Sequence, residues 1–475
     1  MDKKLFFLIL AIVLATILGS VIVYGFWLTL GVLAFLFFLA AAWRWPLIVF
    51  YCLVAYLPFQ LALNLTPDID LMSGRVLILG LFFIWLAKEF YCRQSLKLVR
   101  SVRVSAFLKN RVSAALALFF ILAVASIIDA DNQIWGLRKL LIFASIFPLF
   151  WLTQFLIKNE KEQRILIYVI VGGAIVSSLV SLAQFLGQFI FGREAVMSFW
   201  AANVLPLFSG AGFGSLVASN PSWQVAIGGQ TIMRAIGLFP DPHTLSFYLG
   251  LVFPFVLALL FLGKKKSLAL FIVSCLLLAV LLLTFSRGGY FGLLACLAVF
   301  FLFAWRFFGA REKKFFSACF LVMAAILLLV GRPVATRLAS SFNLSEGSNM
   351  GRLVIWQDSW EIIKKNPIIG VGLGNYPLAV GLEQNYRNAV TSHNLYLDIL
   401  AETGLFGLLA WLALIFAAAK GAIKKIDKAP IVALGALSAL TYFSVHSFFE
   451  TAIFNPTILA MLMIVLGLSA IDYEN

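Results

Sequence analysis

Residues 268–304 read LALFIVSCLLLAVLLLTFSRGGYFGLLACLAVFFLFA, and this stretch decides the fold class. Two apolar runs stand on either side of a short polar junction that contains Arg287. Each run approaches the roughly 20 residues that a helix needs to cross a hydrocarbon layer of ~30 Å. We therefore expect two membrane-spanning helices that meet at this junction.

The rest of the chain has the same apolar character. Of its 475 residues, 63% are hydrophobic and only 12% are charged, and the mean hydropathy is +1.01. The apolar share of an ordinary soluble domain is close to one half. Apolar runs begin near Leu5, Phe26, Pro46, Gly74, Val112, Leu137, Ile165, Thr244, Leu268, Gly289, Phe315, Thr403, Ala429 and Pro456. The first run lacks a clear cleavage site, so we interpret it as a retained helix. The sequence predicts an all-α polytopic membrane protein with about 14 transmembrane helices.

The basic residues orient these helices. The formal net charge is +15, and most of the 36 Lys and Arg residues fall in alternate connections between spans, such as 88–111, 264–266 and 420–428. Lys and Arg are retained on the cytoplasmic side of a membrane, so we expect both termini inside. Topology and attraction to anionic membrane lipid account for the basic charge, and no nucleic-acid partner is expected. The five cysteines form no CxxC pair, and neither a disulfide framework nor a zinc site is indicated.

Two connections are much longer than the others and divide the chain. We predict N-terminal transmembrane helices over 1–191, an outer loop over 192–243, central transmembrane helices over 244–331, a large outer loop over 332–402 and C-terminal transmembrane helices over 403–475. Long loops in compact proteins are usually functional. We expect the larger loop to carry the chemistry.

The larger loop carries the signals of a surface helix and a turn. Ser348 or Asn349 can cap a helix in which Leu353, Trp356, Trp360 and Ile363 recur at helical spacing until Asn366-Pro367 ends it. The glycines of PIIGVGLGNYP, at 370, 372 and 374, follow no strand, so we reject a nucleotide loop and predict a turn packed against the bundle.

His393 belongs to the segment TSHNLYLDILAETGLFG. Thr391 or Ser392 can cap a helix that ends at Gly404, which would place His393 in the first turn. The positive end of a helix disfavours imidazolium, so this histidine would be neutral and able to accept a proton. The alternative is a histidine that only caps the helix or packs at the membrane interface.

Three isolated arginines fall in the same set of loops as the three histidines. Arg287 lies between two spans with Gly288 and Gly289 leaving the backbone open beside it, Arg234 precedes another span, and Arg352 is at the start of the surface helix. Arginines at a membrane boundary often extend to lipid headgroups. Guanidinium is also the preferred partner of phosphate oxygens. Because these arginines lie on the same side of the membrane as the histidines, we favour binding of an anionic lipid diphosphate.

These segments carry a family resemblance. RAIGLFPDPHTLS, TFSRGGYFG, GRLVIWQDSWEIIKKNPIIGVGLGNY and SHNLYLDILAETGLFGLL occur in order between Arg234 and Leu409. Together they resemble the O-antigen ligase and O-antigen polymerase family of bacterial envelope enzymes. The resemblance implies a GT-C-type fold with a large periplasmic loop, in the bacterial inner membrane.

The resemblance also implies an activity, which is transfer of glycan from an undecaprenyl diphosphate carrier to an acceptor hydroxyl on the periplasmic face, with inversion. The phosphate-binding arginines of the family match Arg234 and Arg287, and its essential histidine, the general base, matches His393. We further expect substrate-binding roles for Arg352, His243, Trp356, Asn394 and His446. No cofactor and no metal is expected.

Three questions stay open on the sequence. Asp68 and Asp70 resemble the metal-binding carboxylates of other GT-C-type enzymes, although an acidic pair is more often a solvated turn. A transporter of small anions is the alternative class, but transporters place ionisable groups inside the membrane, where these spans carry few. A ligase would use a lipid A core acceptor, and a polymerase another carrier-linked glycan, with a flippase and a chain-length regulator as partners. The number of spans favours the polymerase.

Overall fold

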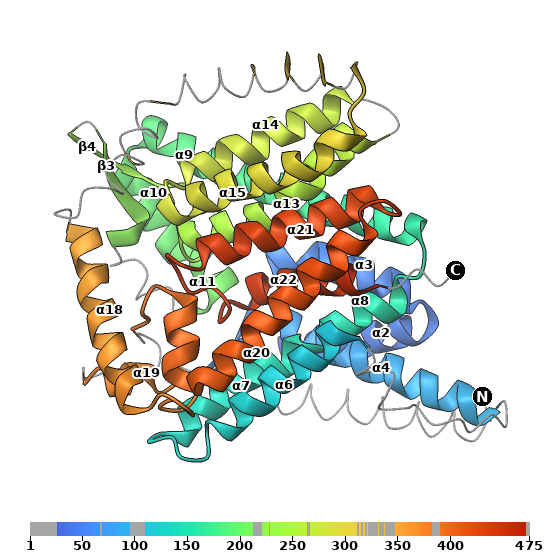
Figure 1. The fold of residues 1–475 in the computed structure, drawn as a ribbon, viewed down its shortest axis with the longest axis horizontal. Coiled ribbons are helices and arrows are strands. Elements are labelled where there is room, and N and C mark those ends of the chain that lie inside the picture. The colour runs from blue at the N-terminus through green and yellow to red at the C-terminus, as the bar shows by residue number, and fades with distance from the viewer. Residues whose placement is uncertain are drawn as a thin grey trace.

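The helices of this protein form one bundle in a computed structural model (Figure 1). The structure describes residues 26–66, 69–95, 110–211, 221–227, 229–263, 267–310, 347–381 and 390–471, with isolated positions between 311 and 346. The bundle helices are α2 (Phe26–Arg44), α3 (Pro46–Tyr56), α4 (Ser73–Ser95), α6 (Arg111–Ala125), α7 (Gln133–Ile146), α8 (Pro148–Leu156), α9 (Glu160–Phe191), α13 (Pro242–Leu262), α14 (Leu268–Leu283), α15 (Arg287–Ala304), α20 (Leu395–Lys425), α21 (Pro430–His446) and α22 (Pro456–Ala470).

These helices confirm an all-α polytopic membrane protein. Within the described residues, five apolar segments are long enough to cross a membrane, including the continuous run of α7 and α8, and six further apolar helices are shorter. The predicted spans that begin near Leu5 and Phe315 lie outside the described residues. Each of the other predicted spans coincides with a helix of the bundle.

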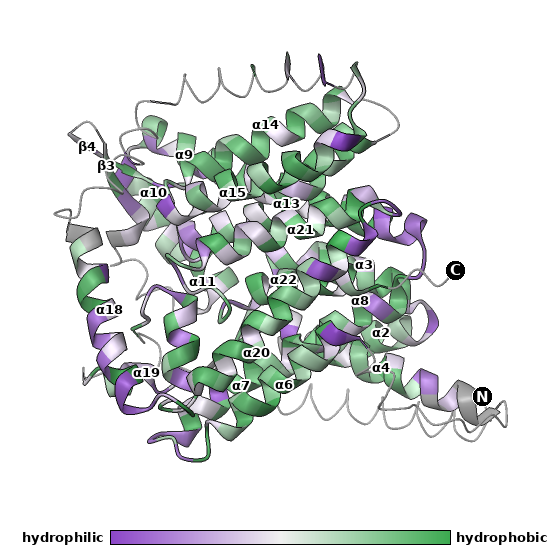
Figure 2. Cartoon of the chain, viewed as in Figure 1, coloured by the Kyte–Doolittle hydropathy of each residue, from purple (hydrophilic) through white to green (hydrophobic). Residues whose placement is uncertain are grey.

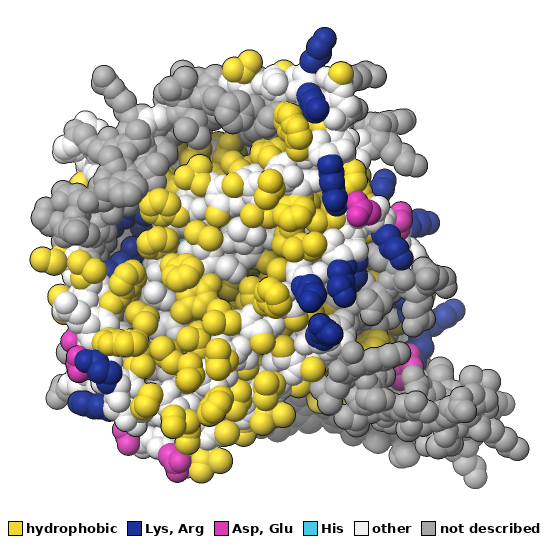
Figure 3. Space-filling view, in the orientation of Figure 1, with side chains coloured by type: hydrophobic (Ala, Val, Ile, Leu, Met, Phe, Trp, Pro, Cys, Tyr) yellow, Lys and Arg dark blue, Asp and Glu magenta, His cyan; other side chains and the backbone are white. Residues whose placement is uncertain are grey.

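The bundle has two ends of different character. Hydrophobic residues cover its middle, and most of the Lys and Arg side chains visible in Figure 3 gather along the right-hand edge of the view. The polar connections on the left of Figures 1 and 2 contain α18 (Gly347–Lys365) and the β3–β4 hairpin (Gln224–Ile227 and Gln230–Met233). We refer to this left-hand end as the site end and to the other as the basic end.

Helix α13 is the centre of the bundle, because 94% of an apolar 18-residue stretch of this helix is buried inside the protein. It packs closely against α21 through small residues opposite large ones. A Cβ atom on Gly250 of α13 would lie 2.0 Å from the Tyr442 ring of α21, and a Cβ on Gly435 of α21 would lie 2.3 Å from Phe255 of α13. Small residues let membrane helices approach each other closely.

The connections between helices at the site end contain short helices and strands. They are η1 (Leu57–Phe59), β1 (Ala62–Thr66), β2 (Ile69–Met72), α10 (Arg193–Phe199), the π turn η2 (Trp200–Val204), α11 (Leu205–Ser209), η3 (Pro221–Trp223) and α19 (Tyr376–Ala379); η4 (Trp305–Phe307) follows α15. The two hairpins, β1–β2 and β3–β4, were not predicted. Beside η1, Gln60 Nε2 donates a hydrogen bond of 2.6 Å to Thr457 Oγ1 of α22, 397 residues later in the chain.

The glycine-rich segment after α18 forms the predicted turn against the bundle. Gly370, Gly372 and Gly374 all have positive φ, at 80°, 94° and 80°. A Cβ on Gly372 would lie 2.4 Å from the Cβ of Ala130, so a larger residue does not fit there. Gly372 N also donates to Glu402 O at 3.0 Å, which fastens the turn to α20.

Helix α18 ends at Lys365, as Asn366-Pro367 predicted, but it differs in its start and in its buried face. It begins at Gly347, before the proposed caps. Its buried residues are Ser359, Ile362 and Ile363, whereas Leu353 and Trp360 of the predicted apolar stripe are 37% and 52% exposed.

Candidate active site

His393 lies directly before α20 and not in its first turn. Asn394 is the N-cap, and its Oδ1 accepts hydrogen bonds from the backbone N–H groups of Tyr396 and Leu397. The prediction that Thr391 or Ser392 caps this helix is therefore wrong. Gly404, the expected end of the helix, is instead a non-helical kink inside α20, with φ 67°. His393 itself has φ 52°, a conformation that non-glycine residues adopt rarely and mostly where the surrounding structure imposes it.

Asp398 fixes the turn that carries His393. Its Oδ1 accepts a 2.8 Å hydrogen bond from the backbone N–H of Ser392, and its Oδ2 accepts one from the Thr451 hydroxyl. The N–H of Leu395 also donates to the carbonyl of Ser447 at 2.9 Å. These contacts join the start of α20 to the loop between α21 and α22, and they bring His393 to Glu450.

Glu450 is the charged centre of the site. Its Oε1 lies 2.8 Å from His393 Nδ1, and its Oε2 lies 3.9 Å from His243 Nε2 and 3.8 Å from Arg352 Nη2. Burial alone would raise the pKa of Glu450, but the charge and hydrogen bond of His393, with His243 and Arg352, hold it well below its usual range. The charge of the Glu450 carboxylate in turn raises the pKa of His393, against the lowering effect of burial. This contact favours imidazolium, the opposite of what the helix terminus led us to expect from the sequence.

Ser286 connects the other two histidines. It caps α15, and its Oγ lies 3.0 Å from His243 Nδ1 and 3.1 Å from His446 Nε2. His446 is fully buried and its ring stacks on Phe247 at 3.7 Å, whereas the His393 side chain is 41% exposed. His393 is therefore the histidine that an incoming molecule can best reach.

The segment around Ser286 is held tightly. Phe285 has φ 49°, so in the described part of the chain both non-glycine residues with positive φ lie at this site. A Cβ on Gly288 would lie 2.6 Å from His446, and one on Gly289 would lie 2.1 Å from Ser246 Oγ. The sequence interpretation that these glycines leave the backbone open was wrong, because they allow α15 to pack against its neighbours.

Arg234 is buried beside the end of α14, with only 2% of its surface exposed. Its Nε donates to Thr284 O at 2.6 Å and its Nη1 to Ser222 O at 2.8 Å. Its Nη2 has no hydrogen-bond partner among the residues that the structure describes. Burial, together with the like charge of Arg337, lowers the pKa of Arg234 to about 9, so it remains a cation at neutral pH. A buried cation with a donor to spare suits an anionic ligand.

Arg287 is the first residue of α15 and is 4% exposed. It follows Ser286 directly, and Arg234 Nε donates to the carbonyl of Thr284, three residues before it. Arg337 is a fourth arginine whose charge reaches Arg234, and the sequence analysis did not single it out.

Trp356 and Asn394, two expected substrate-binding residues, have structural contacts. Trp356 Nε1 donates to the carbonyl of Ser392 at 3.0 Å and so ties α18 to the His393 turn. Asn394 is 7% exposed, and its side-chain oxygen caps α20. Both residues therefore position His393.

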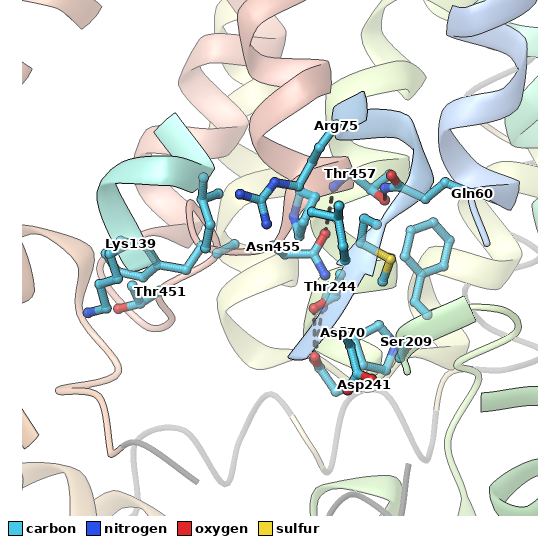
Figure 4. Close-up of a pocket in the computed structure, with 18 of the residues that line it drawn as sticks. Gln60, Asp70, Arg75, Lys139, Ser209, Asp241, Thr244, Thr451, Asn455 and Thr457 are labelled. Carbon is cyan, nitrogen blue, oxygen red and sulfur yellow. Dashed lines mark hydrogen bonds between the residues drawn. The ribbon is translucent and has the colours of Figure 1, made fainter. Parts of the chain in front are cut away.

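A cavity of about 580 Å³ opens beside these groups (Figure 4). Its wall includes Thr391, Thr451 and Asp241, which are near neighbours in sequence of His393, Glu450 and His243. Asp70 also lines it, while Asp68 lies outside the described residues. Within the described part of the chain, no group of three His, Cys, Asp or Glu residues is placed to hold a metal ion.

Part of the chain matches a known protein family. Residues 271–412 match the family described as O-antigen ligase. The matched segment contains Arg287, Arg352 and His393, while Arg234 and Glu450 lie on either side of it. Comparison with curated proteins finds no match.

Proposed function

We propose that this chain, whose residues 271–412 match the O-antigen ligase family, transfers glycan from undecaprenyl diphosphate to an acceptor hydroxyl. Its apolar helices and this match support a multi-pass membrane enzyme that transfers glycosyl groups. The donor, the inversion and the periplasmic position of the site belong to the proposal. The observation that carries it is the contact of 2.8 Å between His393 and Glu450, on the same end of the bundle as two buried arginines.

The arginines supply the site for the leaving group. When the bond between the anomeric carbon and the diphosphate oxygen breaks, negative charge develops on the diphosphate. The side chains of Arg234 and Arg287 are buried inside the protein and do not extend to lipid headgroups at its surface. Their burial favours a role in binding phosphate over a role in membrane anchoring. Preorganised cations in a site that excludes water stabilise developing charge at little reorganisation cost.

His393 supplies the base. With Nδ1–H donating to Glu450, the tautomer is fixed and Nε2 is the nitrogen that accepts a proton. The acceptor hydroxyl forms the new bond to the anomeric carbon, its proton passes to His393 Nε2, and the diphosphate leaves from the opposite face. A single displacement of this kind inverts the anomeric configuration.

The test is transfer from a synthetic undecaprenyl diphosphate glycan by purified protein without added metal. His393→Ala should lower turnover by about 10²–10⁴-fold, the contribution of a positioned general base. His243→Ala and His446→Ala should lose less, because His446 is buried and both contact Ser286. Arg234→Lys should also lose turnover, since lysine keeps the charge but not the forked donors. Wild-type turnover by His393→Ala would refute the base assignment.

The remaining alternatives have their own outcomes in the same preparation. Loss of transfer on EDTA treatment would favour a metal-dependent mechanism through Asp70, which lines the cavity beside the site. Flux of a small anion through reconstituted vesicles that survives His393→Ala would favour a transporter. Transfer to a lipid A core would identify a ligase, and extension of a carrier-linked glycan would identify a polymerase.

A further inference from the structure

The cavity at the site end opens beside the histidine and Glu450 cluster. Its described lining contains Thr391, Thr451 and Asp241 but neither Arg234 nor Arg287. Ser286, which precedes Arg287, contacts His243 and His446. In the proposed displacement the leaving diphosphate and the attacking hydroxyl are on opposite faces of the anomeric carbon. The two arginines that we assign to the diphosphate do not line the described wall of the cavity, which leaves the cavity to the acceptor.

The wall of the cavity has the composition of a sugar site. Trp135, Phe208, Phe239 and Phe454 offer flat apolar surfaces for the C–H faces of a sugar ring, and Gln60 and Asn455 offer amides for its hydroxyls. A volume of about 580 Å³ is within the range of small-ligand pockets. Figure 4 shows the polar side chains converging from β2, α4, α7 and the start of α22.

The described wall of the cavity carries charged side chains of both signs. Three basic side chains, Arg75, Arg138 and Lys139, line it against two acidic ones, Asp70 and Asp241. Asp241 accepts hydrogen bonds from the backbone N–H groups of His243 and Thr244 and from the Thr244 hydroxyl, so its oxygens are used in capping α13.

The basic side chains come from two adjacent helices, α4 and α7. Lys139 is bonded to Glu402 at 2.6 Å, and its ammonium lies 3.9 Å from the centre of the Phe454 ring. Arg75 Nε donates to Ser145 Oγ of α7 at 2.8 Å, which holds its guanidinium between α4 and α7. Guanidinium groups match the geometry of carboxylate and phosphate oxygens. The wall therefore holds two guanidinium groups, from Arg75 and Arg138, of the kind that bind such an anion.

We propose that this cavity binds the acceptor glycan, and that Arg75 and Arg138 recognise an anionic substituent, carboxylate or phosphate, on one of its sugars. The identification of the bound glycan as the acceptor rests on the proposed function. Binding of an acidic sugar, however, can be measured independently of transfer. Arg75 and Arg138 are specificity residues here, and His393 and Glu450 act on the hydroxyl that reacts.

The test measures binding of three probes to the full chain in lipid nanodiscs by calorimetry. The probes are methyl glucuronide, the neutral methyl glucoside and glucose 6-phosphate. At least one anionic probe should bind about tenfold or more tightly than the glucoside, the value of one charge-assisted hydrogen bond. Arg75→Gln and Arg138→Gln should each reduce that preference by about tenfold. Whichever anionic probe binds more tightly identifies the substituent.

The controls separate charge at the cavity from general effects. Arg193→Gln removes a basic residue outside the cavity wall and should keep the preference. Asp70→Asn removes a carboxylate from the wall and should keep or strengthen it, so the proposal stays testable if Arg75→Gln does not fold. Equal binding of all three probes, or a preference that survives both arginine substitutions, overturns the inference.

The transfer assay distinguishes this inference from the proposed function. His393→Ala should bind the anionic probe as the parent does. If the parent fails to transfer glycan but keeps the arginine-dependent preference, the proposed function falls and the anionic sugar site stands. If it transfers glycan without that preference, the inference falls alone. Weaker binding of farnesyl diphosphate in Arg138→Gln, with unchanged binding in Arg234→Lys, would assign the cavity to the donor and overturn the inference.

Discussion

Among single residues, Glu450 is the one that connects the charged and imidazole groups of the site. It contacts His393 and lies within 4 Å of both His243 and Arg352. Its carboxylate raises the pKa of His393 from the ordinary value of 6.5. His393 must be neutral to accept a proton, so the acidic limb of the activity profile should follow this raised pKa.

Glu450→Gln should change that profile in two ways. Loss of the carboxylate destabilises imidazolium, so the pKa of His393 falls and the acidic limb moves to lower pH. Plateau turnover should also fall, by more than about tenfold and at most about 10⁴-fold, because glutamine does not enforce the tautomer. The measurement is turnover between pH 5 and 9. Asp358→Asn, which removes an exposed acid of α18, is the control and should keep the parent profile. An unshifted limb in Glu450→Gln would contradict the pairing.

The sequence identified the residues that are rare, but not the contacts between them. His393, Arg234 and Arg287 stand out because charged and imidazole side chains are scarce in this apolar chain. The role of Glu450 depends on a partner 57 residues away, and that of Ser286 on a partner 160 residues away. No local sequence pattern indicates contacts between residues so far apart in the chain. The position of Ser286 directly before a helix is nevertheless a recognisable signal of an N-cap.

Among the elements, the glycine turn at residues 370–374 connects α20 to the rest of the bundle. The alternating glycines predicted a turn correctly, because only glycine adopts the required positive φ at little cost. The start of α20 and the buried face of α18 were predicted wrongly. Several polar residues in TSHN can each cap a helix, and the buried side of α18 is decided by its contact with the rest of the protein.

Gly372→Ala should destabilise the protein by about 1–3 kcal/mol or more, since the new methyl group meets Ala130 and the backbone is strained. The midpoint of thermal unfolding in detergent measures this. Gly381→Ala is a matched control, because Gly381 also has a positive φ, 79°, but none of the described residues lies within 4 Å of the added atom. An equal loss in both variants would mean that strain alone, and not packing against the bundle, sets the cost.

At the scale of the whole molecule, the basic end and the site end define an orientation that can be tested. The charge pattern predicts the basic end in the cytoplasm. In a cysteine-free background, Gln357→Cys on α18 should react with a membrane-impermeant maleimide in intact cells. Lys424→Cys at the end of α20 should react only after the membrane is permeabilised; both positions are exposed. The reverse pattern would place the site in the cytoplasm and exclude a periplasmic reaction.

The hydrogen bond between Gln60 and Thr457 has a consequence for biosynthesis. The two residues are separated by 397 positions, and both are buried. A ribosome that adds about 5–20 residues per second needs roughly 20–80 s to travel between them. During that interval the amide of Gln60 at the site end has no Thr457 to bond to. Water at the site end would therefore solvate this amide until α22, the last helix of the bundle, supplies its permanent partner.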